Sequence, residues 1–214
     1  LSDGHSMSSC LTRGLLRSGR TTLLARGQLP AVRHENTLYD LRYQVPTFAE
    51  VLARRARLSQ ELHREVGVYP ETKHPTYFCS IGLDLNTRLV QQVRAAGLDH
   101  ANAPIFIQSF ELTNLVDLRQ RFGVNAPLVF LTSASGVPYD LASTGDPTTY
   151  ADLTTAAGLA CLRGIVNGIG PDKDQIIPRD VHGTLAHPTT LAADAHAAGL
   201  MDHPCPFRAQ SMFW

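Results

Sequence analysis

Apolar residues recur at helical spacing directly after Pro46. Phe48, Val51, Leu52, Leu58 and Leu62 lie about three or four positions apart, the spacing of one face of an α-helix. Thr47 followed by Glu50 is a capping-box pattern, in which each side chain accepts from a free backbone N–H of the first turn. A helix is therefore predicted to open at this point, with Gly67 as its left-handed stop.

Short apolar runs then alternate with helical stretches. The runs, which we interpret as strands, are 66–73, 103–110, 126–133, 163–170 and 200–207. The helices are predicted over 85–96 and 112–122, from Asp146-Pro147 onward, and over 190–198. This alternation indicates right-handed βαβ units and a parallel sheet with helices outside it. Five such strands fit an open doubly wound sheet or part of a barrel, and periodicity alone does not choose between them.

The first residues follow neither period. They are rich in Ser, Arg and Gly, so we expect an irregular or poorly ordered leader over 1–37 and one α/β domain over 38–214.

Composition removes several functional classes. Nineteen basic residues balance nineteen acidic ones, so the net charge indicates neither nucleic acid nor a membrane surface as a partner. No apolar run approaches the roughly 18 residues of a membrane-spanning helix. The four cysteines, at 10, 79, 161 and 205, form no CxxC motif and are expected to be free thiols, with a Cys79–Cys205 disulfide left open.

Polar groups stand at the ends of three predicted strands. Glu71 and Lys73 end the first, Gln108 and Ser109 the second, and His203 lies in the last. In parallel α/β folds these carboxyl ends form the rim of the active site. Glu71 and Lys73 are two apart and so point to the same side of an extended segment. A carboxylate for a divalent cation beside an ammonium for a phosphate is one interpretation, and a salt bridge at the rim is the other.

Five segments in order resemble the glycerophosphodiester phosphodiesterase family. They are YQVPTFAEVL, VGVYPETKHP, IFIQSFELTNL, NGIGPDKD and AHAAGLMDHPCPFR, and they span roughly residues 38–208. The resemblance implies a TIM-type (β/α)8 barrel, here incomplete, with about strands three to seven. It also implies hydrolysis of a small-molecule glycerophosphodiester to sn-glycerol 3-phosphate and an alcohol. YPETKHP and HPCPFR resemble the secreted and periplasmic branch, which implies a periplasmic or extracellular location.

The resemblance assigns roles to six residues. Glu71 corresponds to a ligand of the family's divalent cation, Ca or Mg, and Lys73 to the lysine that faces the phosphate. The remaining four are expected to bind substrate: Gln108 and Phe110 as pocket lining, and His203 and Phe207 as the wall around the glycerol. Asn167 and Cys205-Pro206 depart from the closest branch at this wall.

The family's acid–base histidines have no counterpart in the chain. The sequence contains no His-Arg-Gly, no His-Asp and no Glu-x-Asp. His34-Glu35-Asn36-Thr37 is no substitute, because eight residues before Pro46 leave no room for a strand, and His34 is expected in a loop. The chain is therefore expected to be inactive alone, with no catalytic residue assigned.

Two further hypotheses stay open. One is a non-catalytic barrel remnant with weak anion or metal binding, and the other is an unrelated α/β binding module. Whether the incomplete barrel is a phosphodiesterase or a non-catalytic remnant, we expect it to self-associate through open sheet edges. GIGPDKD lacks the frame of a phosphate-binding loop and is expected to form a turn.

Overall fold

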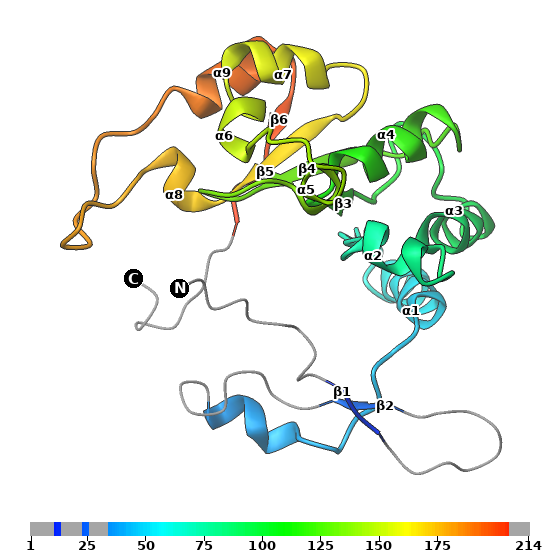
Figure 1. Ribbon diagram of the computed structural model, residues 1–214. Coiled ribbons are helices and arrows are strands. Elements are labelled where there is room, and N and C mark those ends of the chain that lie inside the picture. Colours follow the sequence, from blue (N-terminus) through cyan, green and yellow to red (C-terminus); the bar gives the residue numbers. More distant parts are fainter. Residues whose placement is uncertain (1–10, 14–22, 26–33, 206–214) are drawn as a thin grey trace. The chain divides into compact units, whose positions relative to one another are not determined.

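The computed structural model describes residues 11–13, 23–25 and 34–205 in two compact units, Leu1–Arg54 and Arg55–Trp214. In the first unit, β1 (Leu11–Arg13) pairs antiparallel with β2 (Leu23–Ala25), and a 3-10 helix, η2, spans His34–Tyr39 (Figure 1). The sequence predicts an irregular leader over 1–37, and these elements correct that prediction. His34 accordingly begins a helix and is not in a loop. The domain boundary at residue 38 remains a prediction.

The predicted capping box opens α1 (Phe48–Glu61). The Thr47 amide donates to Glu50 Oε2 at 2.7 Å, and the Glu50 amide donates to Thr47 Oγ1 at 3.3 Å. The predicted stop at Gly67 is wrong. The left-handed residue after the helix is His63, with φ 49°, and the Arg55 guanidinium reaches beyond it to the Val66 carbonyl at 2.7 Å.

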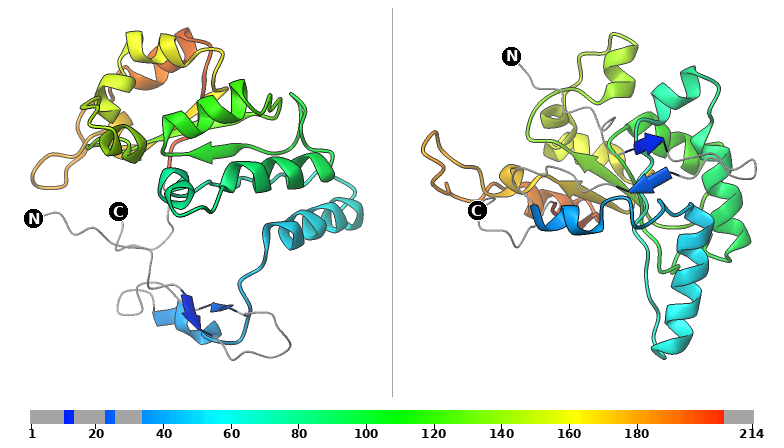
Figure 2. Two further views of the ribbon diagram at one scale, coloured as in Figure 1. Left: turned by 45° about the vertical axis from the view of Figure 1, so that its right-hand side comes forward. Right: turned by 90° about the horizontal axis from the view of Figure 1, so that it is seen from below.

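The second unit is built on a parallel sheet in the order β3-β4-β5-β6. The strands span Ile107–Ser109, Leu128–Thr132, Gly168–Pro171 and Met201–Asp202. Figures 1 and 2 show the arrows side by side, with α4 and α9 lying along the sheet. Four of the five predicted strands therefore form, each shorter than its apolar run.

The remaining predicted strand, 66–73, pairs with the sheet without forming a continuous ladder. It contacts β3 and the residues before it through two parallel bridges, Val68 with Ile105 and Glu71 with Gln108. The two bridges share one register, and Pro70 lies between them. Because proline has no N–H to donate, the ladder is interrupted there. The amides on either side still bond, Phe106 to the Val68 carbonyl at 3.0 Å and Thr72 to the Gln108 carbonyl at 2.9 Å.

Helices α3 (Leu85–Ala95) and α4 (Leu112–Gln120) form as predicted, each followed by a glycine at positive φ, Gly97 at 68° and Gly123 at 61°. Helix α9 (Leu191–Ala197) also forms as predicted. Short helices α2 (Pro75–Ser80) and α8 (Lys173–Ile176) are additional. The second begins at the end of the segment predicted to be a turn, whose first residues belong to β5.

The helix predicted from Asp146-Pro147 is wrong. Asp146 accepts from the Thr148 amide at 2.9 Å, a local turn that competes with helix formation. Three short helices surround it instead: α5 (Tyr139–Ser143), α6 (Tyr150–Leu153) and α7 (Ala156–Leu162). Thr149 and Asp152 supply the capping box of α6.

The two faces of the sheet differ in burial. On the face toward the helices, Ile107, Phe130 and Ile169 are fully buried. Each such side chain contributes about 1.5–3 kcal/mol through removal from water. On the other face, Phe106 and Gln108 stay partly exposed, whereas Val129 and Leu131 of β4 are buried. In a closed barrel this second face lines the interior.

Cys79, Cys161 and Cys205 are free thiols in the part of the chain that the structure describes, and Cys10 lies outside it. None of the described helices is long and apolar enough to cross a membrane.

Candidate active site

Five of the six residues singled out in the sequence lie toward the carboxyl ends of the parallel segments. The register aligns Glu71 with Gln108, and Gln108 continues through β4 and β5 to Met201 of β6. Phe110 and His203 each lie two residues further along their own segments. Because side chains alternate between faces, all of these share the partly exposed face of the sheet. Phe207 lies outside the described residues.

Glu71 and Lys73 form an ion pair, with 3.7 Å between Oε1 and Nζ. Their side chains are 26% and 38% exposed, so solvent screens the pair and it adds little to stability. The same exposure leaves both charged groups accessible from the open face of the sheet. The arrangement suits binding of an anion by the ammonium or of a cation by the carboxylate.

A complete metal site is not present among the residues that the structure describes. No group of three or more His, Cys, Asp or Glu side chains is close enough there to hold an ion. Ca²⁺ takes six to eight oxygen ligands and Mg²⁺ six, some of them water, so one carboxylate such as Glu71 could not hold either ion by itself. The described residues thus do not suffice for the divalent cation that the resemblance implies.

An aromatic cluster continues the site toward His203. The Tyr69 hydroxyl lies 2.7 Å from His203 Nδ1, and the Phe106 ring packs edge-on against the imidazole with 4.9 Å between centroids. Gln108 Nε2 donates to the Tyr69 carbonyl at 3.3 Å. Burial, and to a lesser extent the negative charge of the Cys205 thiolate, raises the pKa of Tyr69 to about 12.

Tyr69 and Phe106 are not among the residues that the sequence singles out. A signal for them is present, because each lies two positions before a predicted site residue on the same segment.

A cavity of about 290 Å³ opens beside the ion pair. One wall is Glu111, which is 2% exposed and accepts from the Thr76 amide at 2.9 Å. Another is Tyr150, whose hydroxyl donates to the Phe110 carbonyl at 3.1 Å. Burial, then the charges of Asp140 and Glu111, raise the pKa of Tyr150 to about 12. Glu111 was also missed, although it directly follows Phe110. The cavity is lined by Glu71, Thr72, Lys73, His74, Phe110, Glu111, Ser133, Val137, Tyr139 and Tyr150.

Comparison with known proteins finds relatives both by sequence and by structure. No protein-family profile matches the chain. Glycerophosphodiester phosphodiesterase GDPD6 of Arabidopsis thaliana is 29% identical over 224 residues, which cover 98% of this chain and 56% of that protein. A crystal structure of a putative glycerophosphoryl diester phosphodiesterase from Silicibacter pomeroyi superposes with a TM-score of 0.60 at 15% identity. That match covers 97% of this chain and 67% of the other.

These matches and the parallel sheet define the class of protein as an incomplete TIM-type barrel, of which the described residues hold four strands. The resemblance seen in the sequence is confirmed. The chain is similar to glycerophosphodiester phosphodiesterases, and it spans a little over half the length of the curated relative it matches.

Proposed function

We propose that this chain carries the phosphate-binding side of an enzyme that hydrolyses glycerophosphodiesters to sn-glycerol 3-phosphate and an alcohol. The observation that supports it most is the convergence of Glu71, Lys73, Gln108 and His203, from segments more than 130 residues apart at the extremes, on one face at the carboxyl ends of the sheet. In parallel α/β barrels this end is where active sites lie.

In this proposal the Lys73 ammonium contacts the phosphate oxygens as a compact positive charge. Gln108 and Phe110 line the pocket, and His203, held by Tyr69, forms part of the wall around the glycerol. Glu71 would be one oxygen ligand of a Ca or Mg ion, whose other protein ligands would have to come from outside the described residues. The roles of the other side chains do not depend on that ion.

The missing histidine motifs favour a second candidate, a barrel remnant that binds anions or metal weakly without catalysis. In both cases the isolated chain should be a poor hydrolase. A periplasmic or extracellular location is also a proposal, and it rests on the family resemblance of YPETKHP and HPCPFR.

Hydrolysis of glycerophosphocholine by the purified chain tests this directly. We expect little or no release of glycerol 3-phosphate with Ca²⁺ or Mg²⁺ present, because each missing proton-transfer group is worth about 10²–10⁴ in rate. Robust metal-dependent release would contradict the expectation, and His34 or His203 would then have to be reassigned as catalytic.

Binding of glycerol 3-phosphate, measured by calorimetry, tests the phosphate site without catalysis. Lys73→Met should weaken binding about tenfold, which corresponds to roughly 1.4 kcal/mol. Glu71→Gln should not weaken it, since the substitution removes a negative charge near the ligand. Arg57→Met, which removes a positive charge from the exposed face of α1, is the matched control. Equal losses in Lys73→Met and Arg57→Met would sink the proposed phosphate site.

A further inference from the structure

Thr72 lies between Glu71 and Lys73 in the chain, and its side chain points to the opposite face of the sheet. It is 6% exposed. Its hydroxyl donates to Asn114 Oδ1 at 2.7 Å, and its carbonyl accepts from the Ser109 hydroxyl at 3.2 Å. The ion pair on the open face is thus attached to a buried polar contact behind it.

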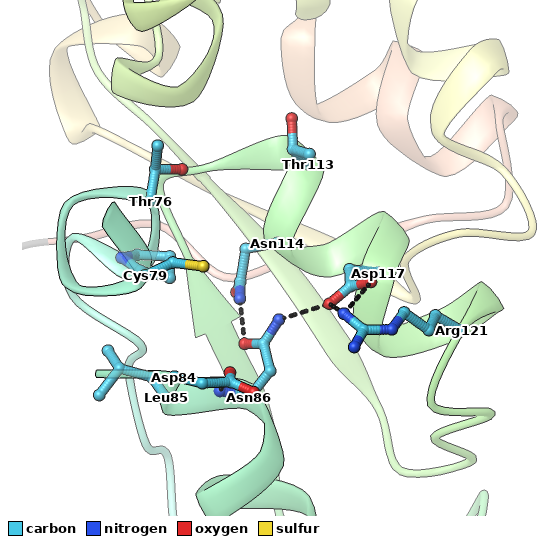
Figure 3. Close-up of a pocket in the computed structure, with 10 residues that line it drawn as sticks. Thr76, Cys79, Asp84, Leu85, Asn86, Thr113, Asn114, Asp117 and Arg121 are labelled. Atoms are coloured by element: carbon cyan, nitrogen blue, oxygen red, sulfur yellow. Dashed lines mark hydrogen bonds and ion pairs between the residues drawn. The ribbon is translucent and has the colours of Figure 1, made fainter. Parts of the chain in front are cut away.

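That contact continues as a chain of side-chain hydrogen bonds through two helices (Figure 3). Asn114 of α4 donates through Nδ2 to Asn86 Oδ1 of α3. Asn86 in turn donates through Nδ2 to Asp117 Oδ2 at 2.8 Å, and Asp117 pairs with Arg121 at 3.4 Å. We call Thr72, Asn114, Asn86 and Asp117 the polar relay.

The chemistry of the last member sets the direction of the polar relay. An ionised carboxylate can only accept, so Asn86 must turn its NH₂ group toward Asp117 and its carbonyl toward Asn114. Asn114 must then donate to Asn86 and offer its own carbonyl to the Thr72 hydroxyl. Hydrogen bonds aligned in this way polarise one another, and each side chain has one orientation that satisfies both neighbours.

These bonds lie between a cavity on one side and the edge of the sheet on the other. A cavity of about 320 Å³ borders Asn86, Asn114 and Asp117, and the two asparagines are themselves buried (Figure 3). On the sheet side, Pro70 has no N–H to donate, so one ladder bond is missing. Its carbonyl still accepts from the Gln108 amide, and the Thr72 amide donates to the Gln108 carbonyl, each at 2.9 Å. The side-chain bonds therefore add a constraint from α3 and α4 to the backbone bonds that hold the segment on β3.

We propose that the polar relay is the device that positions Glu71 and Lys73, and that Thr72, Asn114, Asn86 and Asp117 are positioning residues of the site. Through these bonds, Thr72 is held at a fixed place relative to α3 and α4. The side chains of its chain neighbours, Glu71 and Lys73, lie on the other face of the sheet. The importance of this positioning rests on the proposed function, but the geometry of the ion pair can be measured without activity.

The test measures the chemical shifts of the Lys73 side chain by NMR in the full chain. The difference in these shifts between the wild type and Glu71→Gln reports how closely the two side chains interact. In a Thr72→Val background that change should fall to about half or less, because the hydroxyl that anchors the segment is gone. Affinity for glycerol 3-phosphate should fall about tenfold in the same variant.

Two further variants separate positioning from general stability. Thr72→Ser keeps the hydroxyl and should restore both readouts. Thr132→Val removes another buried threonine hydroxyl, which donates to Gln175 Oε1 at 2.6 Å at the end of β4, and should leave both readouts unchanged. If Thr72→Val behaves like Thr132→Val, the proposal is overturned.

Asp117→Asn keeps the inference testable if Thr72→Val does not fold. Asp117 is 26% exposed, and its amide analogue keeps the shape but can also donate, so the polar relay loses its single direction. The Lys73 response to Glu71→Gln should shrink, and an unchanged response would count against the proposal. Absence of glycerol 3-phosphate binding in the wild-type chain would reject the proposed function alone, because the ion-pair readout does not require a ligand.

Discussion

Tyr69 shows how a single side chain is changed by its place in the site. Its phenol is half-buried against Phe106 and hydrogen-bonded to His203, and burial is the main cause that raises its pKa to about 12 from an ordinary value of 10.0. The folded state therefore keeps this proton over a range in which the unfolded chain has lost it. The resulting stability is fully present below pH 10 and is lost as pH rises through about 12.

Tyr69→Phe should remove part of this alkaline loss of stability. The free energy of unfolding of the wild type should fall more steeply above pH 10 than that of the variant, as measured by urea unfolding at several pH values. A difference titration of the two proteins by ultraviolet absorbance should give a midpoint near 12 for Tyr69. A midpoint at 10, or identical slopes, would show that the phenol is not desolvated.

Helix α3 begins with an aspartate cap, and it carries Asn86 of the polar relay. Asp84 Oδ1 accepts from the amides of Asn86 and Thr87 at 2.9 Å and 3.3 Å, and Oδ2 accepts from the Thr87 hydroxyl at 2.5 Å. The Thr87 hydroxyl is the largest cause that lowers the pKa of Asp84, with partial burial acting against it. The cap therefore stabilises the charged carboxylate together with the first turn.

Asp84→Ala should destabilise the chain by about 1 kcal/mol, the usual cost of removing a helix N-cap. Asp84→Asn should keep most of the cap at neutral pH, since an amide oxygen still accepts. The charge contribution of wild-type Asp84 is present above pH 3.8 and is lost as pH falls through the lowered pKa. Urea unfolding at neutral and acid pH checks both points, and a loss below about 0.3 kcal/mol for Asp84→Ala would contradict the role of the cap.

The sheet of the second unit presents an open face and two edges among the described residues. The segment with Glu71 forms one edge, and β6, only Met201–Asp202, forms the other. Tyr69 and Met201 on the open face are 41% and 37% exposed. Unpaired edges and exposed apolar groups of this kind pair readily with other chains.

We therefore predict that the isolated polypeptide self-associates. Size-exclusion chromatography with light scattering should give a mass above that of one chain, rising with concentration. A sharp monomeric peak together with a cooperative thermal transition would contradict this and would indicate a fold that closes without further strands.

Local signals in the sequence specify most of the elements. Thr47 with Glu50 marks the start of α1, and Gly97 and Gly123 mark the ends of α3 and α4, because caps and stops depend on neighbours within a few residues. Where two local signals compete, the prediction fails. Asp146 precedes a proline that suits a helix, yet its side chain bonds to the Thr148 amide and forms a turn.

The candidate site also has a part that the sequence indicates and a part that only the tertiary structure determines. Glu71, Lys73 and Gln108 are visible in the sequence because a polar group at the end of an apolar strand has no role in the core. Their placement on one face, the contact between Tyr69 and His203 across 134 residues, and the polar relay from Thr72 to Asp117 are set by long-range packing. In the sequence, a threonine or asparagine that will be buried cannot be told from an exposed polar residue. Its hydrogen-bond partner is fixed only when the helices pack on the sheet.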